Sequence, residues 1–151
     1  MSLKSDIQSK LAMILLADVT LTAGTVTDEA SASIDTKEFD AIVLGLSLNR
    51  ALAGSDAVTY KFQQSDNGST GWTDVPADGN LPYSAEGAIV GNNSPYIQTV
   101  GCFSSDRYVR VVFNGVVDTD DLVISIAVAL EDRHRESDRY IDGGLPTDGQ
   151  P

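Results

Sequence analysis

The sequence has very little of the chemistry that nucleophilic and metal-dependent enzymes use. Its 151 residues include one cysteine, Cys102, and one histidine, His134. A single cysteine excludes an intramolecular disulfide, and no neighbouring His or Cys completes a metal site around it. His134 lies in a charged run, so nothing in the sequence pairs a nucleophile with an oriented base. We expect Cys102 to be a buried core thiol, and we expect no cofactor, no metal and no enzymatic activity.

Acidic residues are frequent, but their spacing matches no established site. Asp28-Glu29, Asp66 with Asp74, and the run 118–121 bring carboxylates together in the sequence. Two carboxylates can hydrolyse glycosides, but nothing here fixes their separation. The runs 66–69 and 118–121 offer oxygen ligands for calcium without the twelve-residue spacing of an EF-hand. Turns favour Asp and Asn, so we interpret these residues as turn formers. Gly-rich phosphate loops and the HExxH and CxxC motifs are also missing.

Basic residues are few. Ten Lys and Arg stand against 22 Asp and Glu, which gives a formal net charge of −12. A field of this sign repels phosphate backbones, so no nucleic acid is expected as a partner.

Long apolar runs are missing too. The longest run, residues 11–17, falls short of the roughly 20 residues needed to cross a bilayer. Asp6 and Asp18 flank it, which does not fit a signal peptide. We therefore expect a soluble protein made in the cytoplasm, with no membrane contact.

What the sequence does have is enough apolar material for one core, since 42% of its residues are hydrophobic and 21% are charged. Residues 57–75 are typical of a β-hairpin: Val58, Tyr60 and Phe62 alternate with polar residues, and an Asp-Asn-Gly turn follows. Trp72 begins the return strand, and we expect it in the core. An alternative is an aromatic sugar-binding platform, but core positions are favoured for its members, which are Tyr60, Trp72, Tyr83 and Tyr96.

Further strands are expected along the chain. Residues 39–48 are apolar enough for a central strand buried on both faces. Asn114-Gly115 is a strong hairpin signal, although the bend can instead lie at 118–121. Short strands with turns at regular intervals are typical of an antiparallel β-sandwich, jelly-roll or Ig-like. The other expected strands are residues 96–103, 107–113 and 122–130.

The two ends of the chain differ from this middle part. Residues 1–22 are an N-terminal segment in which 4–17 fit either a short helix or an extended arm. Residues 23–130 form the expected β-sandwich domain, with 23–33 as a loop or edge strand. Residues 131–151 are a charged tail without a core of its own, expected as a solvated terminus or an extended arm.

Candidate contact residues come from a breaker-rich loop and from this tail. A loop as long as 76–95 is uncommon inside a compact domain and usually has a role. Its alternative is ordinary coil with one short strand. The arginines of the tail can pair with carboxylates on a neighbour, and its apolar residues can dock there. The candidate partner-binding residues are Leu81, Tyr83, Ile89, Arg133, Arg135, Arg139, Tyr140, Ile141 and Leu145.

Several short segments of the sequence resemble segments of small structural proteins of tailed bacteriophages. They are the hairpin segments 62–68 and 72–75, the segment 33–41 that leads into an apolar strand, the strand 104–112, and the charged end 131–135 of a closing apolar strand. The resemblance implies a virion component, in the first place a capsid decoration or cement protein. Its partners are then the major capsid protein and further copies of itself, with a trimer as the expected closed form.

The acidic charge favours the outer surface of the capsid, since packed DNA repels an acidic lining. Two alternatives stay open. One is a carbohydrate-binding or receptor-binding module of a tail appendage. The other is a tail or head–tail connector protein.

Overall fold

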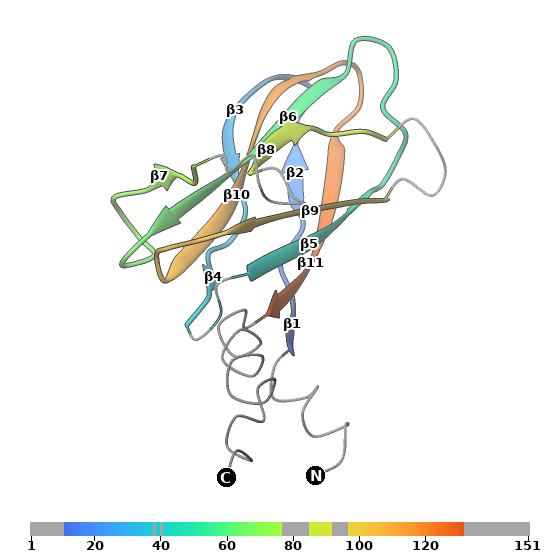
Figure 1. Ribbon diagram of the computed structural model, residues 1–151. Coiled ribbons are helices and arrows are strands. Elements are labelled where there is room, and N and C mark those ends of the chain that lie inside the picture. Colours follow the sequence, from blue (N-terminus) through green and yellow to red (C-terminus); the bar gives the residue numbers. More distant parts are fainter. Residues whose placement is uncertain (1–10, 38, 40, 77–84, 92–96, 132–151) are drawn as a thin grey trace, which may run out of the picture.

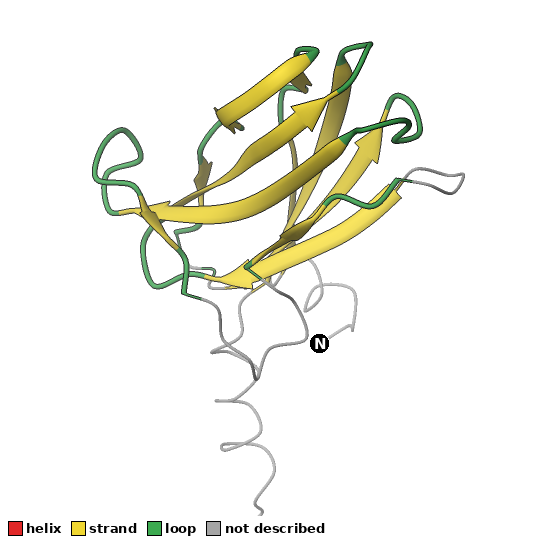
Figure 2. Cartoon of the chain, turned by 90° about the horizontal axis from the view of Figure 1, so that it is seen from above, coloured by secondary structure: helices red, strands yellow, loops and turns green. Residues whose placement is uncertain are grey.

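The computed structural model describes residues 11–37, 39, 41–76, 85–91 and 97–131. These residues form an all-β fold in which two antiparallel sheets pack face to face, as the sequence predicts (Figure 1). Strands and loops make up the whole of the described chain (Figure 2). The expected β-sandwich is therefore confirmed.

The first sheet has five strands in the order β1-β11-β5-β9, and β2 also pairs with β11. Its first two strands lie in the expected N-terminal segment, so the sheet extends into that segment. For residues 11–15 the extended alternative is confirmed over the helix, and residues 4–10 lie outside the described chain. The bounds are β1 Leu11–Leu15, β2 Val19–Leu21, β5 Ala41–Leu48, β9 Ile97–Phe103 and β11 Leu122–Glu131.

The second sheet has six strands in the order β3-β10-β6-β7, with β4 pairing β10 and β8 pairing β6. Strand β3 is the expected edge strand, and β8 is a short strand in the breaker-rich loop. The bounds are β3 Gly24–Ala30, β4 Ile34–Asp35, β6 Ala57–Ser65, β7 Thr73–Asp74, β8 Glu86–Ala88 and β10 Tyr108–Val117.

The core lies between the sheets and follows the period of two in each strand. Tyr60 and Phe62 of β6 are buried, and their rings meet edge to face with centroids 6.1 Å apart. Cys102 is also buried there, and burial raises the pKa of its thiol to about 12. The interpretation of Cys102 as a core thiol is confirmed. The β11 residues of the core are Leu122, Ile124, Ile126, Val128 and Leu130.

The bend after β10 lies at residues 118–121, so the hairpin expected at Asn114-Gly115 is wrong and the alternative is right. Strand β10 runs through both residues to Val117. An irregularity in its pairing with β3 explains their identity: the side-chain oxygen of Asn114 accepts a hydrogen bond from the Asp28 amide at 2.8 Å. Asp28 has a φ of 49° and Gly115 a φ of 137°. Asn114 and Gly115, residue types common in turns, form a β-bulge here.

Trp72 does not lie in the core, which corrects the expectation that it anchors the hairpin from inside. Its side chain is half-buried on the outer face of the six-stranded sheet, where the Arg110 guanidinium lies 4.4 Å from the ring centroid. The two-residue strand β7 begins only at Thr73, so the alternation of β6 does not carry over to Trp72. The Trp72 ring instead makes a cation–π contact with Arg110.

Strand β5 is central, as expected, but the described chain buries only one of its faces. Ile42, Leu44 and Leu46 point into the core, while Val43 and Gly45 are partly exposed on the other side. The expectation that both faces are buried is wrong for this chain alone. The outer face of the five-stranded sheet therefore exposes apolar residues of β5.

Candidate interaction surface

The two outer faces of the sandwich differ sharply in chemistry. The outer face of the six-stranded sheet is polar and carries ion pairs between Lys61 and Asp74 and between Arg107 and Asp35. Gln63 links the first pair to Arg110, because it donates to Asp74 at 2.9 Å and accepts from Arg110 at 2.7 Å. This face has the composition of an ordinary solvated surface.

Its carboxylates are held in their charged form. The Arg107 guanidinium donates to Asp35 at 2.8 Å and lowers the pKa of that carboxyl to about 2. The pKa of Asp74 is also lowered, first by the hydrogen bond from Gln63 and then by Lys61. Both pairs are exposed, so each contributes little to stability.

The outer face of the five-stranded sheet is apolar, and we call it the apolar sheet face. Three of its side chains are strongly exposed: Met13 at 69%, Leu15 at 84% and Ile97 at 60%. Glu131, the last residue of β11, is the one charged residue at an outward strand position among the described residues, and it lies at one end of the face. The uncharged outward positions with a described side chain are Met13, Leu15, Thr20, Ala41, Val43, Gly45, Ser47, Ile97, Thr99, Gly101, Phe103, Val123, Ser125, Ala127 and Ala129.

Strand register orders this face into rows of large and small residues. One row runs Met13, Ala129, Val43, Gly101, and the next runs Leu15, Ala127, Gly45, Thr99. The large side chains of β1 therefore form a ridge at one edge, and small residues form a shallow floor beside it. Side chains two apart on a strand share a face, so this relief follows directly from the register.

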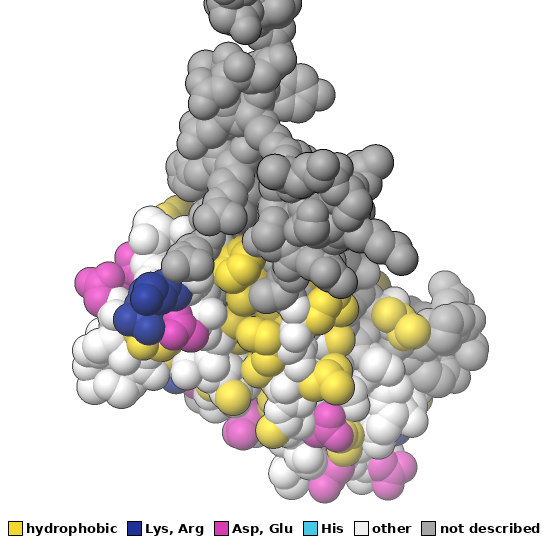
Figure 3. Space-filling view, turned by 90° about the horizontal axis from the view of Figure 1, so that it is seen from below, with side chains coloured by type: hydrophobic (Ala, Val, Ile, Leu, Met, Phe, Trp, Pro, Cys, Tyr) yellow, Lys and Arg dark blue, Asp and Glu magenta, His cyan; other side chains and the backbone are white. Residues whose placement is uncertain are grey.

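In the view from below, hydrophobic side chains gather on the underside of the molecule, where β1, β5 and β11 lie (Figure 3). Charged side chains lie at the left and along the lower margin of this group. A contiguous exposed apolar patch on a soluble domain marks an interaction surface more often than chance exposure does. The apolar sheet face is accordingly the strongest candidate site on the described chain.

Two of the segments that resemble phage structural proteins, 62–68 and 104–112, lie together at one corner of the sandwich. Gln64 of the hairpin accepts hydrogen bonds from the Ser104 hydroxyl at 3.0 Å and the Ser105 amide at 3.2 Å. The Asn67 side chain closes the hairpin turn by accepting from the Thr70 amide at 2.8 Å. Tyr108 lies over this turn next to Gly68. The two segments therefore both stabilise the corner between β6 and β10.

Replacing Gly68 by alanine is expected to destabilise the protein by about 2 kcal/mol. Gly68 has a φ of 73°, and a Cβ there would stand 2.8 Å from Cδ1 of Tyr108. Gly71→Ala is the matched control, because Gly71 has a φ of 66° and open space around it. Urea unfolding of the two variants should show a loss of only about 1 kcal/mol for Gly71→Ala. Equal losses would mean that the Tyr108 contact contributes nothing.

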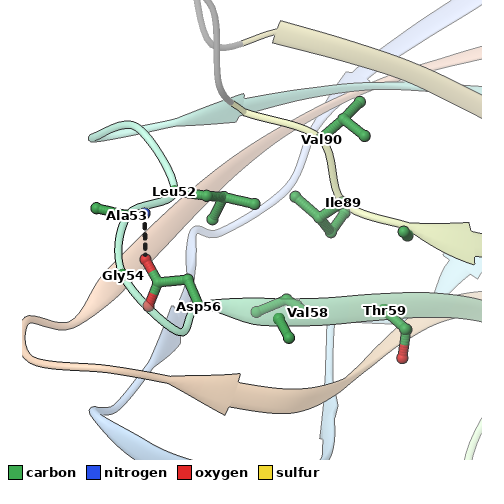
Figure 4. Close-up of a pocket in the computed structure, with 10 residues that line it drawn as sticks. Leu52, Ala53, Gly54, Asp56, Val58, Thr59, Ile89 and Val90 are labelled. Carbon is green, nitrogen blue, oxygen red and sulfur yellow. Dashed lines mark hydrogen bonds between the residues drawn. The ribbon is translucent and has the colours of Figure 1, made fainter.

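A second feature lies at the opposite end of β6, where an open hollow of about 540 Å³ is lined by the 52–59 and 88–90 segments (Figure 4). Asp56 beside it accepts the Ala53 amide at 2.9 Å and the Asp118 amide at 2.7 Å. It also forms an ion pair with Arg50 at 2.5 Å, and its side chain is only 1% exposed. The Asp56 carboxylate already has hydrogen-bond and ion-pair partners in the loops on both sides. It is therefore not available to bind a ligand in this hollow.

The candidate partner-binding residues fall into two groups. Ile89 is 4% exposed and packs in the core, because β8 pairs with β6 and turns the side chain inward. We therefore withdraw it as a contact residue. The others, Leu81, Tyr83, Arg133, Arg135, Arg139, Tyr140, Ile141 and Leu145, lie outside the described residues.

Sequence reasoning missed the apolar sheet face. A signal for it exists, because residues 41–48 and 122–130 are apolar at both parities of the strand. Such a pattern fits a strand that is covered on both sides. In the described residues one side of these strands is buried in the core and much of the other side is exposed.

The described residues contain no cluster of three or more His, Cys, Asp or Glu able to hold a metal ion. The acidic turn 118–121 is used structurally, since the Asp121 carboxylate accepts the Ala23 amide at 2.9 Å. Within the described part of the chain there is no helix long and apolar enough to span a membrane.

No protein-family model matches the chain, and no curated protein matches it. Among solved structures it is similar to a chain described as "Bacillus endospore appendages form a novel family of disulfide-linked pili". The identity is 18% and the TM-score 0.40, with 81% of this chain and 88% of that chain covered.

Proposed function

We propose that the protein is a non-enzymatic structural subunit of a tailed-phage virion, a decoration or cement protein on the outer capsid surface. Its partners are the major capsid protein and further copies of itself. The observation that carries the proposal is the contrast between the two sandwich faces, one solvated and charged and the other apolar over most of its area. A subunit that assembles needs such a face, and an isolated soluble domain does not.

Two further features support this assignment. Two of the segments that resemble phage structural proteins lie together at the β6–β10 corner, where Gln64 accepts hydrogen bonds from Ser104 and Ser105. The net charge of −12 suits an outer surface away from packed DNA. Stabilisation follows by mass action, because a protein that binds only the assembled shell adds its binding free energy to the cost of disassembly.

The proposal is tested by cryo-electron microscopy of particles purified from cells that produce the protein. We expect density for the sandwich at symmetry-related positions on the outer shell. Particles with Leu15→Asp should lose most of that density, whereas Val116→Asp, on an exposed valine of the other sheet, should retain it. Density confined to the tail or a vertex would contradict the decoration role and favour an appendage or connector. Particles without any density would contradict the virion assignment.

A further inference from the structure

We propose that the apolar sheet face binds the same face of a second copy of this chain, as a two-fold pair whose axis runs along the strands. The inference rests on the proposed function, since it names the partner of the surface that makes this protein an assembly subunit. It differs from that function in requiring no capsid.

Charge is the first argument for a second copy. The chain carries a net charge of −12, so most approaches between two copies are repulsive. The apolar sheet face carries one charged residue at its outward strand positions, Glu131 at the end of β11. Away from that end, two such faces can meet without desolvating an ion, and ion desolvation is a large cost of burying charge. The uncharged polar residues on the face are Thr20, Thr99, Ser47 and Ser125, and the two serines lie together because they pair directly.

Shape is the second argument. An axis along the strands between β11 and β5 places β1 of one copy over β9 of the other. Leu15 then meets the row position of Thr99, and Met13 meets that of Gly101. In these two rows a large side chain lies over a small one. Of the neighbouring rows, one places Phe103 over the Leu11 position, and the other places Ile97 beyond the end of β1. The floor of Gly45, Ala127 and Ala129 lets the sheets approach to the roughly 10 Å spacing of packed sheets.

The alternative two-fold axis, across the strands, fits less well. It would place β1 over β1, so that the exposed side chains of Met13 and Leu15 collide with their own copies. The floor around Gly45 would then be left unfilled. Large-over-small packing is what fills an interface to the density of a protein interior, so the geometry points to the axis along the strands.

The chain's own ends are poorer occupants of this face. Leu11 pairs with Glu131, so residues 1–10 and 132–151 begin at the same end of the sheet. Their sequences are rich in charge, above all the run Asp-Arg-His-Arg-Glu-Ser-Asp-Arg at 132–139. Covering an apolar face with that run would desolvate charged groups against a surface that offers them few ion-pair partners. A second copy offers a matching apolar face instead.

The pair has a consequence for assembly. A two-fold interface uses the same patch on both copies and closes after two of them. The apolar sheet face therefore does not build the trimer expected from capsid symmetry. Any higher assembly must use another surface of the pair.

Sedimentation equilibrium of the full chain tests the pairing. The wild-type protein is expected to be a dimer, and Leu15→Glu and Thr99→Lys should each raise the dissociation constant by about 100-fold, because each buries an unpaired charge. Val116→Glu is the matched control, an exposed β-strand valine on the other sheet, and should leave the dimer intact.

Mixing the Leu15→Glu and Thr99→Lys proteins gives the sharper result. In a mixed pair the two new charges face each other across one end, and the other end is wild type. Restored dimer in the mixture supports the axis along the strands. A monomeric wild type, a multimer whose size neither variant changes, or a mixture that stays monomeric overturns the proposal. A dimer without capsid density removes only the virion assignment, and capsid binding by a monomer removes only the pairing.

Discussion

Replacing Gly115 by alanine is expected to destabilise the protein by about 4 kcal/mol, a large part of the roughly 5–15 kcal/mol typical of a domain. Gly115 has a φ of 137°, a conformation that side chains rarely adopt. A Cβ at this position would also collide with the backbone carbonyl of Ala57 on β6. Backbone in a central strand pair cannot yield like a flexible side chain, so β10 and β6 would have to separate locally.

Gly24→Ala provides the control for this effect. Gly24 has a φ of 119°, in the same left-handed half of conformational space, but nothing lies within 4 Å of a Cβ built there. It should lose about 1–2 kcal/mol from conformational strain alone. Chemical unfolding of both variants measures the difference. If Gly115→Ala loses no more than Gly24→Ala, the close approach of β10 and β6 at this point does not matter for stability.

The second large effect is expected at Asp56, where Asp56→Ala should cost about 3 kcal/mol at neutral pH. The Arg50 guanidinium would lose its ion-pair partner while still bonded to the Asp120 carbonyl at 2.7 Å. The amides of Ala53 and Asp118 would lose their acceptor as well. The 49–56 and 118–121 loops, which this carboxylate holds together, would separate.

The same site predicts how stability depends on pH. The hydrogen bond from Arg50, helped by the amides of Ala53 and Asp118, holds the pKa of Asp56 well below its usual value. The unfolded chain, with an ordinary aspartate pKa of about 4, therefore takes up the proton first as the pH falls. The contribution of Asp56 to stability is fully present above about pH 5 and is lost progressively below it. Asp35 acts in the same direction, but both members of its ion pair are exposed.

Urea unfolding at pH 7 and pH 3 measures this dependence. The wild-type protein should lose more stability between these two values than Asp56→Ala, which has already lost the group responsible. Asp66→Asn, a change at an exposed turn aspartate, should keep the wild-type slope. An unchanged slope in Asp56→Ala would assign the acid sensitivity to other carboxylates.

Local pattern was enough for much of the fold. The alternation of Val58, Tyr60 and Phe62 defined one face of β6, and all three are buried. The apolar run 122–130 gave β11, and the lone Cys102 was correctly placed in the core. These features depend on the period of two in a strand, which the sequence displays directly. The antiparallel sandwich follows from the same pattern repeated with turns between.

Other features depended on residues distant in the sequence. Asn114-Gly115 looks like a hairpin turn locally, but β3 and β6 on either side keep β10 extended, and the pair becomes a bulge site. Trp72 looks like a core residue, but Arg110 provides a surface contact for its ring. Ile89 looks like a loop contact, but pairing of β8 with β6 turns it inward. In each case residues distant in the sequence overrode the local preference.

The sequence by itself determined the fold class, the acidic character and the burial of the alternating strands, because these depend on composition and on near neighbours. Only the tertiary structure decided which apolar strand face stays open. The rows of Met13, Ala129 and Val43 exist because β1, β11 and β5 align in one register, and no segment taken alone contains that alignment. The candidate interaction surface is thus a property of strand order, since side chains from three distant segments must lie side by side to form it.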